Sequence, residues 1–210
     1  MNPRTTHTYE PADHPRSAYR RTGQSGMAPG LQTWVTVVWG ERQDGGMGLT
    51  VRVLGEDDWK TLREVRLRAL LESPGSFYST YEEAHRLDED GWRERLRSAE
   101  RVTLLAELDG RGVGMIVGAP AGEDEQMDDA ALMLAMWVEP ESRGQGVADA
   151  LTTALLDWSR AQGYGTLLLW VYGAAPRAAT FYRRAGFVPT GRVETFGDDS
   201  RPLTLMAQAL

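Results

Sequence analysis

The stretch of the sequence that points most directly to chemistry is RGQGVA, Arg143–Ala148, where an apolar run ends and a helical pattern begins. The first N–H groups of a helix have no partners inside the helix, and the helix dipole makes that end partly positive. Gly144 and Gly146 let a ligand approach these N–H groups closely, and Arg143 adds a fixed positive charge. This combination is typical of an anion site, and diphosphates are common occupants. The alternative is a glycine-rich turn that only joins a strand to a helix.

Two other phosphate-binding patterns fit the same stretch poorly. Gly144 and Gly146 begin a G-x-G-x-x-G-like string, but Asp149 occupies the third glycine position. The next expected strand, 166–172, lacks the terminal acid that binds a ribose in dinucleotide folds. No lysine follows the glycines, as a P-loop requires.

The elements that position this loop follow from hydrophobic periodicity. Strands are predicted at 49–54, 101–108, 112–120, 130–138, 166–172, 187–193 and 202–209. Helices are predicted after the acidic residues 56–58, around Trp92, Leu96 and Ala99, along Val147, Leu151, Ala154, Leu155 and Trp158, and around Ala178, Phe181 and Tyr182. The aromatic and acidic segment 76–86 has no clear pattern, and 121–129 is predicted to be a solvated acidic loop.

The predicted order of elements, β-α-α-β-β-β-α-β-α-β-β, mixes hairpins with parallel crossovers. Asp109-Gly110 between two apolar runs predicts a hairpin. The order favours an α/β protein of the α+β kind with a mixed sheet, over a doubly wound sheet or a sandwich. Residues 49–210 are predicted to form this domain, and 1–48 a largely disordered N-terminal extension in which 31–39 is compatible with a strand.

Two motifs carry a resemblance to a known family. The segment 138–163 resembles the acetyl-CoA-binding core of GCN5-related N-acetyltransferases, the GNAT family, whose Q/R-x-x-G-x-G/A signature is matched by Arg143, Gly146 and Ala148. The segment APRAATFYRRAGF, 175–187, resembles the family's N-x-x-A-x-x-x-Y-x-x-x-G-F pattern. Ala175 stands where the family has Asn, which removes one polar contact to the cofactor. The two motifs and the expected order of elements agree over about residues 49–210.

The resemblance implies the GNAT acyl-CoA N-acyltransferase fold, a mostly antiparallel sheet of about six or seven strands flanked by about four helices. It also implies that acetyl-CoA is the co-substrate. The end of strand 130–138 would pair with the pantetheine arm, the loop N–H groups would hold the pyrophosphate, and the helix around Ala178 would line the other side. The implied cofactor-binding residues are Met136, Trp137, Val138, Arg143, Gly144, Gln145, Gly146, Val147, Ala148, Ala178 and Tyr182.

The implied activity is direct transfer of an acetyl group from acetyl-CoA to a primary amine. Tyr182 is the expected acid that protonates the leaving thiolate, and the N–H of Val138 is expected to polarise the thioester carbonyl. Many relatives have a Glu on the strand before the loop, but 132–138 contains no acid. Glu82 and Glu83 are candidate bases bordering the acceptor site, and the alternative, which the sequence slightly favours, is that both are ordinary surface acids.

The same region leaves other residues with two interpretations. Phe77, Tyr78 and Tyr81 would form an apolar wall for the acceptor or belong to the core. Glu139 is predicted to point into the turn and to be solvated. Because an obvious base is missing and Ala175 departs from the pattern, an idle acetyl-CoA-binding sensor or interaction module stays open beside the enzyme.

The amino-acid composition limits the kinds of partner that we expect for the protein. The formal net charge of -7 disfavours nucleic acid and suits a cationic amine. The absence of cysteine excludes disulfides and thiolate metal sites, and with three histidines no metal is expected. No stretch has the length and apolarity of a membrane span, and the N-terminus lacks a signal peptide's apolar core. A cytoplasmic protein without a membrane partner is therefore expected, and a homodimer stays open.

Overall fold

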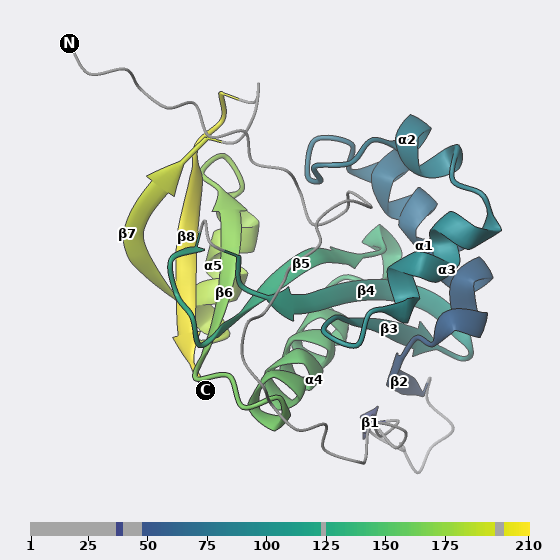
Figure 1. The fold of residues 1–210 in the computed structure, drawn as a ribbon, viewed down its shortest axis with the longest axis horizontal. Coiled ribbons are helices and arrows are strands. Elements are labelled where there is room, and N and C mark those ends of the chain that lie inside the picture. Colours follow the sequence, from purple (N-terminus) through teal and green to yellow (C-terminus); the bar gives the residue numbers. More distant parts are fainter. Residues whose placement is uncertain (1–36, 40–47, 123–124, 196–199) are drawn as a thin grey trace.

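The computed structural model describes residues 37–39, 48–122, 125–195 and 200–210. Its strands form one sheet, with helices on both faces (Figure 1). The strands are β1 Val37–Trp39, β2 Leu49–Val53, β3 Val102–Leu108, β4 Arg111–Pro120, β5 Ala130–Val138, β6 Thr166–Tyr172, β7 Val188–Glu194 and β8 Leu203–Ala209. The helices are α1 Trp59–Glu72, α2 Tyr81–His85, α3 Glu89–Arg97, α4 Val147–Ala161 and α5 Pro176–Arg184, with short 3-10 turns at Glu56–Asp58 (η1) and Pro140–Ser142 (η3).

The sheet is mixed, as predicted. Its strand order is β1-β2-β3-β4-β5-β6-β8-β7, and β5–β6 is the parallel pair among antiparallel neighbours. Asp109 and Gly110 have φ values of 50° and 76°, which suits the predicted hairpin between β3 and β4. Strand β1 lies within the segment 31–39 that was compatible with a strand, and it pairs with β2. Helix α2, which forms inside the unassigned segment 76–86, was not predicted. The rest of the predicted extension lies outside the described residues.

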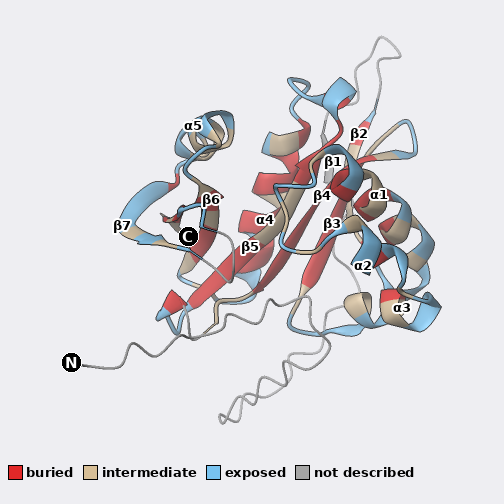
Figure 2. Ribbon diagram, turned by 90° about the horizontal axis from the view of Figure 1, so that it is seen from above, coloured by how far each residue is buried: buried red, intermediate tan, exposed pale blue. Residues whose placement is uncertain are grey.

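Helices cover the two faces of the sheet with separate hydrophobic clusters. On one face α4 packs against β2–β6, and Leu151 and Leu155 are completely buried there. On the opposite face α1 packs against β4 and gathers α2 and α3 around the buried Trp92. Figure 2 shows the buried strands between these layers. Each buried side chain of this size contributes about 1.5–3 kcal/mol to stability. The sheet therefore holds the residues at the ends of its strands in fixed positions.

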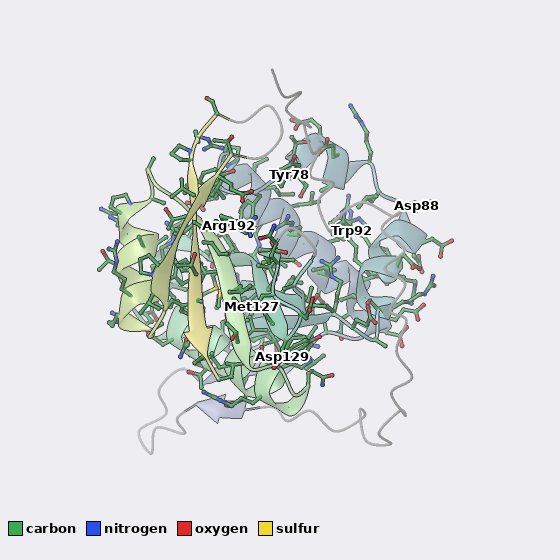
Figure 3. The ribbon with its side chains drawn as sticks, turned by 60° about the vertical axis from the view of Figure 1, so that its left-hand side comes forward. Tyr78, Asp88, Trp92, Met127, Asp129 and Arg192 are labelled. Atoms are coloured by element: carbon green, nitrogen blue, oxygen red, sulfur yellow. The ribbon has the colours of Figure 1, made fainter. Side chains whose placement is uncertain are left out.

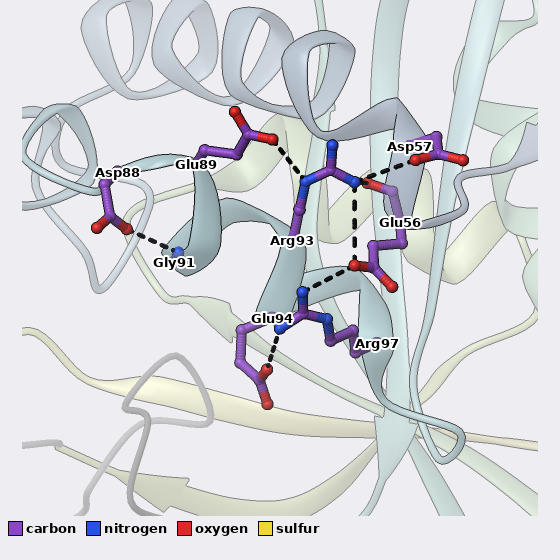
Figure 4. A network of polar contacts seen from close by, with 8 residues as sticks. All are labelled: Glu56, Asp57, Asp88, Glu89, Gly91, Arg93, Glu94 and Arg97. Atoms are coloured by element: carbon purple, nitrogen blue, oxygen red, sulfur yellow. Dashed lines mark hydrogen bonds and ion pairs between the residues drawn. The ribbon is translucent and has the colours of Figure 1, made fainter.

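The α1–α3 layer is tied together by surface ion pairs (Figure 4). Arg93 of α3 bonds to Asp57 of η1 at 3.0 Å, and Arg97 bonds to Glu56 at 2.8 Å. Exposed pairs of this kind contribute about 0–1 kcal/mol each. They therefore orient α3 against the start of α1 rather than stabilise the fold. None of the helices in the described ranges is long and apolar enough to cross a bilayer.

Two predictions about the surface are wrong. Ala99 lies beyond the end of α3 and is exposed, because Ser98 adopts an extended backbone conformation. Glu125, in the segment predicted to be a solvated acidic loop, is only 4% exposed. It accepts hydrogen bonds from Trp170 Nε1 at 3.0 Å and from the Gly122 N–H at 2.7 Å. Its partner Trp170 is 45 residues away in the chain, beyond the reach of any local pattern.

Candidate active site

Strands β5 and β6 separate part-way along their length. They pair only over Ala130–Met133 and Thr166–Leu169. Beyond that point β5 continues beside β4 to Val138, whereas β6 continues beside β8 to Tyr172. The second half of β5 therefore has a backbone edge that β6 does not pair with.

A β-bulge accompanies the separation. Ala135 has a φ of 51°, and the register between β4 and β5 shifts between Met115 and Val117. A bulge bends its strand and increases the local twist. The bulge thus supplies a physical reason for β5 to leave β6 after Met133.

The backbone of Val138 faces the unpaired side of β5. The N–H of Glu139 donates to the Val113 carbonyl of β4 at 2.8 Å. Because successive N–H groups along a strand point in opposite directions, the N–H and C=O of Val138 point away from β4. The Val138 carbonyl accepts a 2.9 Å hydrogen bond from Arg143 Nε. The group expected to polarise a thioester carbonyl therefore points to the side where the strands part.

The loop after β5 has the backbone of an anion site. Gly144 and Gly146 have φ values of 77° and 83°, a region that other L-residues occupy at a cost of roughly 1–2 kcal/mol. A Cβ at either position would meet no atom within 4 Å, so the backbone conformation, and not crowding within the protein, requires glycine. Gly146 is the N-cap of α4, which leaves the N–H groups of Val147 and Ala148 in the unsatisfied first turn. Gln145 Nε2 braces the loop by donating to the Glu141 carbonyl at 2.8 Å.

Tyr182 and Ala178 project from α5 into the same hydrophobic cluster as this loop. That cluster also contains Met136, Val138, Val147 and Ala148. The Tyr182 ring meets Phe181 and Phe187 edge-on, at centroid distances of 5.3 and 5.8 Å. Burial raises the pKa of Tyr182 to about 12. Its hydroxyl therefore keeps its proton at physiological pH and acts as a donor.

Trp137, predicted with the cofactor residues, turns its side chain to the other face. It is 4% exposed in the α1 cluster, and its Nε1 donates to Glu72 Oε2 at 3.1 Å. Because backbone groups alternate along the strand, the N–H and C=O of Trp137 point towards β4, so neither its side chain nor its polar backbone groups face the unpaired side of β5.

Glu72, the last residue of α1, is a carboxylate of the site that the sequence analysis did not predict. Besides Trp137, Arg143 Nη2 donates to its Oε2 at 2.9 Å, and the Ser73 hydroxyl bonds to the same oxygen. Burial raises the pKa of Glu72, but the hydrogen bonds from Ser73, Trp137 and Arg143 bring it below its ordinary value. Its partners lie 65 and 71 residues away in the chain, so no spacing rule marks it. Glu72 joins the end of α1 to the anion loop.

Comparison with known proteins agrees with this geometry. The model of the Acetyltransferase (GNAT) family matches residues 65–187, which is more than half of the chain. The chain belongs to the GNAT acetyltransferase family.

The relatives of this GNAT protein are distant. N-acetyltransferase 8 of Mus musculus is 33% identical over 94 residues, which are 45% of this chain and 40% of the mouse protein. The chain thus spans about two fifths of that relative's length. The GNAT domain of S. lividans PAT matches with a TM-score of 0.63 at 22% identity, over 80% of this chain and 93% of that one. The yncA protein of Salmonella typhimurium, solved with its cofactor acetyl-CoA, matches with a TM-score of 0.61 at 19% identity, over 77% and 94% of the two chains. The structural likenesses confirm the predicted fold.

Glu139 of this GNAT protein is not solvated, contrary to prediction. It is 8% exposed and accepts hydrogen bonds from Arg111 Nη1 at 2.5 Å and Arg68 Nη1 at 2.7 Å. The Arg111 hydrogen bond is the main cause that lowers the pKa of Glu139. Arg68 also donates to the Gly112 carbonyl at 2.5 Å. Glu139 therefore links α1 and β4 to the end of β5, and both of its carboxylate oxygens accept hydrogen bonds.

Glu83 has a structural partner, and Glu82 lies exposed beside it on α2. The Thr80 N–H donates to Glu83 Oε2 at 2.8 Å, while the Glu83 N–H donates to Thr80 Oγ1 at 3.2 Å. This reciprocal pair is a capping box, and the Thr80 backbone hydrogen bond is the main cause that lowers the pKa of Glu83. Within the described residues, no hydrogen bond or ion pair links either glutamate to β5 or to the anion loop. Of the acids considered, Glu72 contacts both.

Aromatic residues of the α1–α2 loop have different surroundings. Phe77 lies under the Arg66 guanidinium at 4.6 Å, whereas Tyr78 is 46% exposed. Figure 3 labels Tyr78 on this loop and Arg192 on β7. Arg201, just before β8, donates to the Gly75 carbonyl at 2.8 Å and so joins the loop to the C-terminal strands. An apolar acceptor wall at Tyr78 stays a prediction. Among the described residues, no group of three or more acidic or histidine side chains is arranged to hold a metal.

Proposed function

We propose that this GNAT protein is an N-acetyltransferase that moves the acetyl group of acetyl-CoA to a primary amine by direct transfer. The observation that carries the proposal is the separation of β5 from β6 directly beside a loop with two positive-φ glycines and unsatisfied helix N–H groups. Family membership supports the reaction class. The amine is identified only by its chemistry.

The residues present fit acetyl-CoA. The N–H groups at the start of α4 suit a diphosphate, and the open space beside Gly144 and Gly146 leaves the backbone accessible. The C=O of Val138 offers a hydrogen bond that the N–H of an amide-containing arm can use, and its N–H stays for the thioester carbonyl. Arg143 Nε holds that carbonyl in the ligand-free protein, so its side chain is expected to shift when the arm binds.

When bound, acetyl-CoA would supply an acyl carbon that gains a bond to the amine nitrogen and loses its bond to sulfur, which leaves as a thiolate and then takes a proton from water. The Val138 N–H stabilises negative charge on the carbonyl oxygen. Tyr182, held protonated by its pKa of about 12, donates a hydrogen bond to the sulfur as charge develops there.

Glu72 receives the positive charge of the amine. Its three donors all bind Oε2, and its lowered pKa keeps it ionised at neutral pH. A carboxylate with a lowered pKa binds an ammonium ion better than it retains a proton, so the proton lost by the nitrogen passes on to water. Glu72 thus concentrates and orients the amine at the end of β5.

The test is a screen of the full chain with acetyl-CoA and a panel of primary amines, including polyamines, amino acids, aminoglycosides and peptides with free N-termini. Release of free thiol is measured with a thiol reagent, and the acetylated product is identified by mass spectrometry. The proposal expects thiol release with at least one amine, and a rate about 100-fold lower for Tyr182→Phe. Acetyl-CoA binding in calorimetry with no release for any amine would favour the idle module. Absence of acetyl-CoA binding would refute both functions.

A further inference from the structure

The guanidinium of Arg143 contacts two of the polar groups to which the proposed function gives a role. Its Nε donates to the Val138 carbonyl at 2.9 Å, and its Nη2 donates to Glu72 Oε2 at 2.9 Å. We call these two hydrogen bonds the Arg143 bridge. The Val138 carbonyl is the group offered to the amide-containing arm, and Glu72 is the carboxylate offered to the amine. One side chain therefore joins the cofactor side of the site to its acceptor side.

The bridge can open without moving Glu72. The Arg143 side chain is 50% exposed and the Glu72 side chain 31%, so water weakens the ion pair between them. Glu72 Oε2 also accepts hydrogen bonds from Trp137 Nε1 and from the Ser73 hydroxyl, which are neutral donors. Trp137 is itself only 4% exposed. These two donors hold the carboxylate at the end of β5 when the guanidinium leaves.

The arm of the cofactor competes with the bridge at Val138. An N–H of the arm that uses the Val138 carbonyl approaches from the side of β5 that β6 leaves unpaired, where Arg143 Nε already lies. Nε and Nη2 belong to one rigid, planar guanidinium. A guanidinium that gives up the Val138 carbonyl therefore also loses its alignment with Glu72.

Departure of Arg143 changes what Glu72 offers to an amine. While the guanidinium lies 2.9 Å from Oε2, its charge offsets that of the carboxylate and repels an incoming ammonium ion. Arg68, one turn earlier on α1, does not replace it, because Glu139 holds Arg68 Nη1 at 2.7 Å. Once Arg143 has moved, the charge of Glu72 is available to the amine.

We propose that the Arg143 bridge couples the two substrates: the arm of acetyl-CoA displaces Arg143 from Val138 and Glu72, and the freed carboxylate then holds the amine. The inference rests on the proposed function, because it takes the arm to lie on the β5 edge and the amine to lie at Glu72. Arg143 acts on the amine through Glu72 and is in this respect a positioning residue. By linkage, the amine strengthens CoA binding by the same factor by which CoA strengthens amine binding.

The first test needs no amine and uses CoA alone as the probe. NMR follows the titration of the Glu72 carboxyl group in the full chain labelled with isotopic glutamate, and Glu72→Gln identifies the signal. Burial raises the pKa of Glu72, whereas the hydrogen bonds from Ser73, Trp137 and Arg143 lower it. Saturating CoA should therefore raise this pKa in the wild type. In Arg143→Gln the pKa should be higher from the start, and CoA should not raise it further.

Glu139 is the internal control in the same spectra. It is a second glutamate held by arginines, Arg68 and Arg111, and neither of them belongs to the bridge. CoA should leave its pKa unchanged. A rise in the Glu72 pKa that persists in Arg143→Gln would come from the negative charge of CoA itself and would overturn the proposal.

The second test measures the coupling directly by calorimetry. The probe is the amine that gives the fastest thiol release in the screen, titrated into the full chain with and without saturating CoA. The wild type should bind it about fivefold more tightly with CoA, the upper end for a partly exposed ion pair. In Arg143→Gln the two affinities should agree within about twofold. Arg160→Gln is the matched control, because Arg160 is an exposed arginine that pairs with Asp157 at 3.0 Å in the last turn of α4, and it should keep the wild-type ratio.

The outcomes distinguish the coupling from the function on which it rests. Equal amine affinities with and without CoA in the wild type, or a Glu72 pKa that CoA does not change, would refute the coupling. Thiol release by the same protein would leave the proposed function intact. Failure of the wild-type protein to bind CoA and acetyl-CoA would refute both.

Discussion

Replacing Tyr182 by Phe tests the acid of the proposed reaction. The ring meets Phe181 and Phe187 edge-on, and no described residue hydrogen-bonds to its hydroxyl, so the substitution should leave the packing intact. The phenol pKa of about 12 lies roughly 3.5 units above that of a thiol, which makes complete proton transfer to the thiolate uphill by about 5 kcal/mol. Donation as a hydrogen bond that strengthens while the C–S bond breaks avoids that cost. We therefore expect kcat to fall about 100-fold, near the lower end of general acid catalysis, with acetyl-CoA affinity changed less than about threefold.

Stopped and continuous thiol-release assays measure kcat, and calorimetry measures acetyl-CoA affinity. Tyr164→Phe is the control, since Tyr164 lies at the other end of α4 against Trp158. The ratio of wild-type to Tyr182→Phe rates should also stay constant from about pH 7 to 10, because a phenol with a pKa of about 12 remains protonated throughout. A ratio that declines towards pH 10 would show a pKa near the ordinary value of about 10. Equal losses of rate and affinity would show that the hydroxyl mainly holds the cofactor, and no loss would leave Tyr182 as a core aromatic.

Three further substitutions test the rest of the site. Glu72→Gln should raise the KM for the amine at least about tenfold with little change in acetyl-CoA affinity, and an unchanged amine KM would remove Glu72 from the acceptor site. Glu139→Gln should lower the free energy of unfolding in urea by about 2 kcal/mol, because it weakens a buried carboxylate's bonds to Arg68 and Arg111. Because the pKa of Glu139 is lowered in the folded protein, its stabilisation is present above the unfolded pKa of about 4.3 and is lost as pH falls through the folded pKa. The difference in unfolding free energy between wild type and Glu139→Gln should therefore shrink in acid. A difference that does not depend on pH would contradict the ion-pair account. Gly146→Glu should abolish acetyl-CoA binding while Gly146→Asn, which tolerates positive φ better, should retain more of it, and equal calorimetric affinities in folded variants would show that the loop does not contact the ligand.

The elements that could be predicted are those with local signals. Asp109-Gly110 marked its hairpin because positive φ favours these residue types. The run 166–172 was predicted as a strand, and Leu167, Leu168 and Leu169 are buried between β5 and β8. The short α2 was missed because its five residues are too few for a helical period, and its stability comes from the Thr80–Glu83 capping box.

The engaged carboxylates could not be predicted, because their partners are distant in the chain. Glu139 finds Arg68 across 71 residues, and Glu72 finds Trp137 across 65. From the sequence alone, Glu72 has the features of a solvated acid at a helix end, and Glu139 has those of a solvated acid in a turn. The glycine loop was predictable for the opposite reason, since its backbone conformation and its helix start are both encoded within six residues.

The bulge at Ala135 affects both the distant contacts of Glu72 and the local backbone of the site. A residue other than glycine at a φ of 51° costs roughly 1–2 kcal/mol, and such strain persists where the surrounding structure requires it. Side chains alternate along a strand, yet Leu134 and Trp137, three residues apart, both pack against the α1 cluster. Only the extra residue makes that possible. The same shift that turns Trp137 towards Glu72 turns the Val138 N–H away from β4, to the side that β6 leaves unpaired. One strained residue thus positions both of the groups to which the proposed function gives a role, the Glu72 carboxylate for the amine and the Val138 N–H for the thioester carbonyl. For this reason the separation of β5 and β6, and not the glycine loop alone, carries the proposed chemistry.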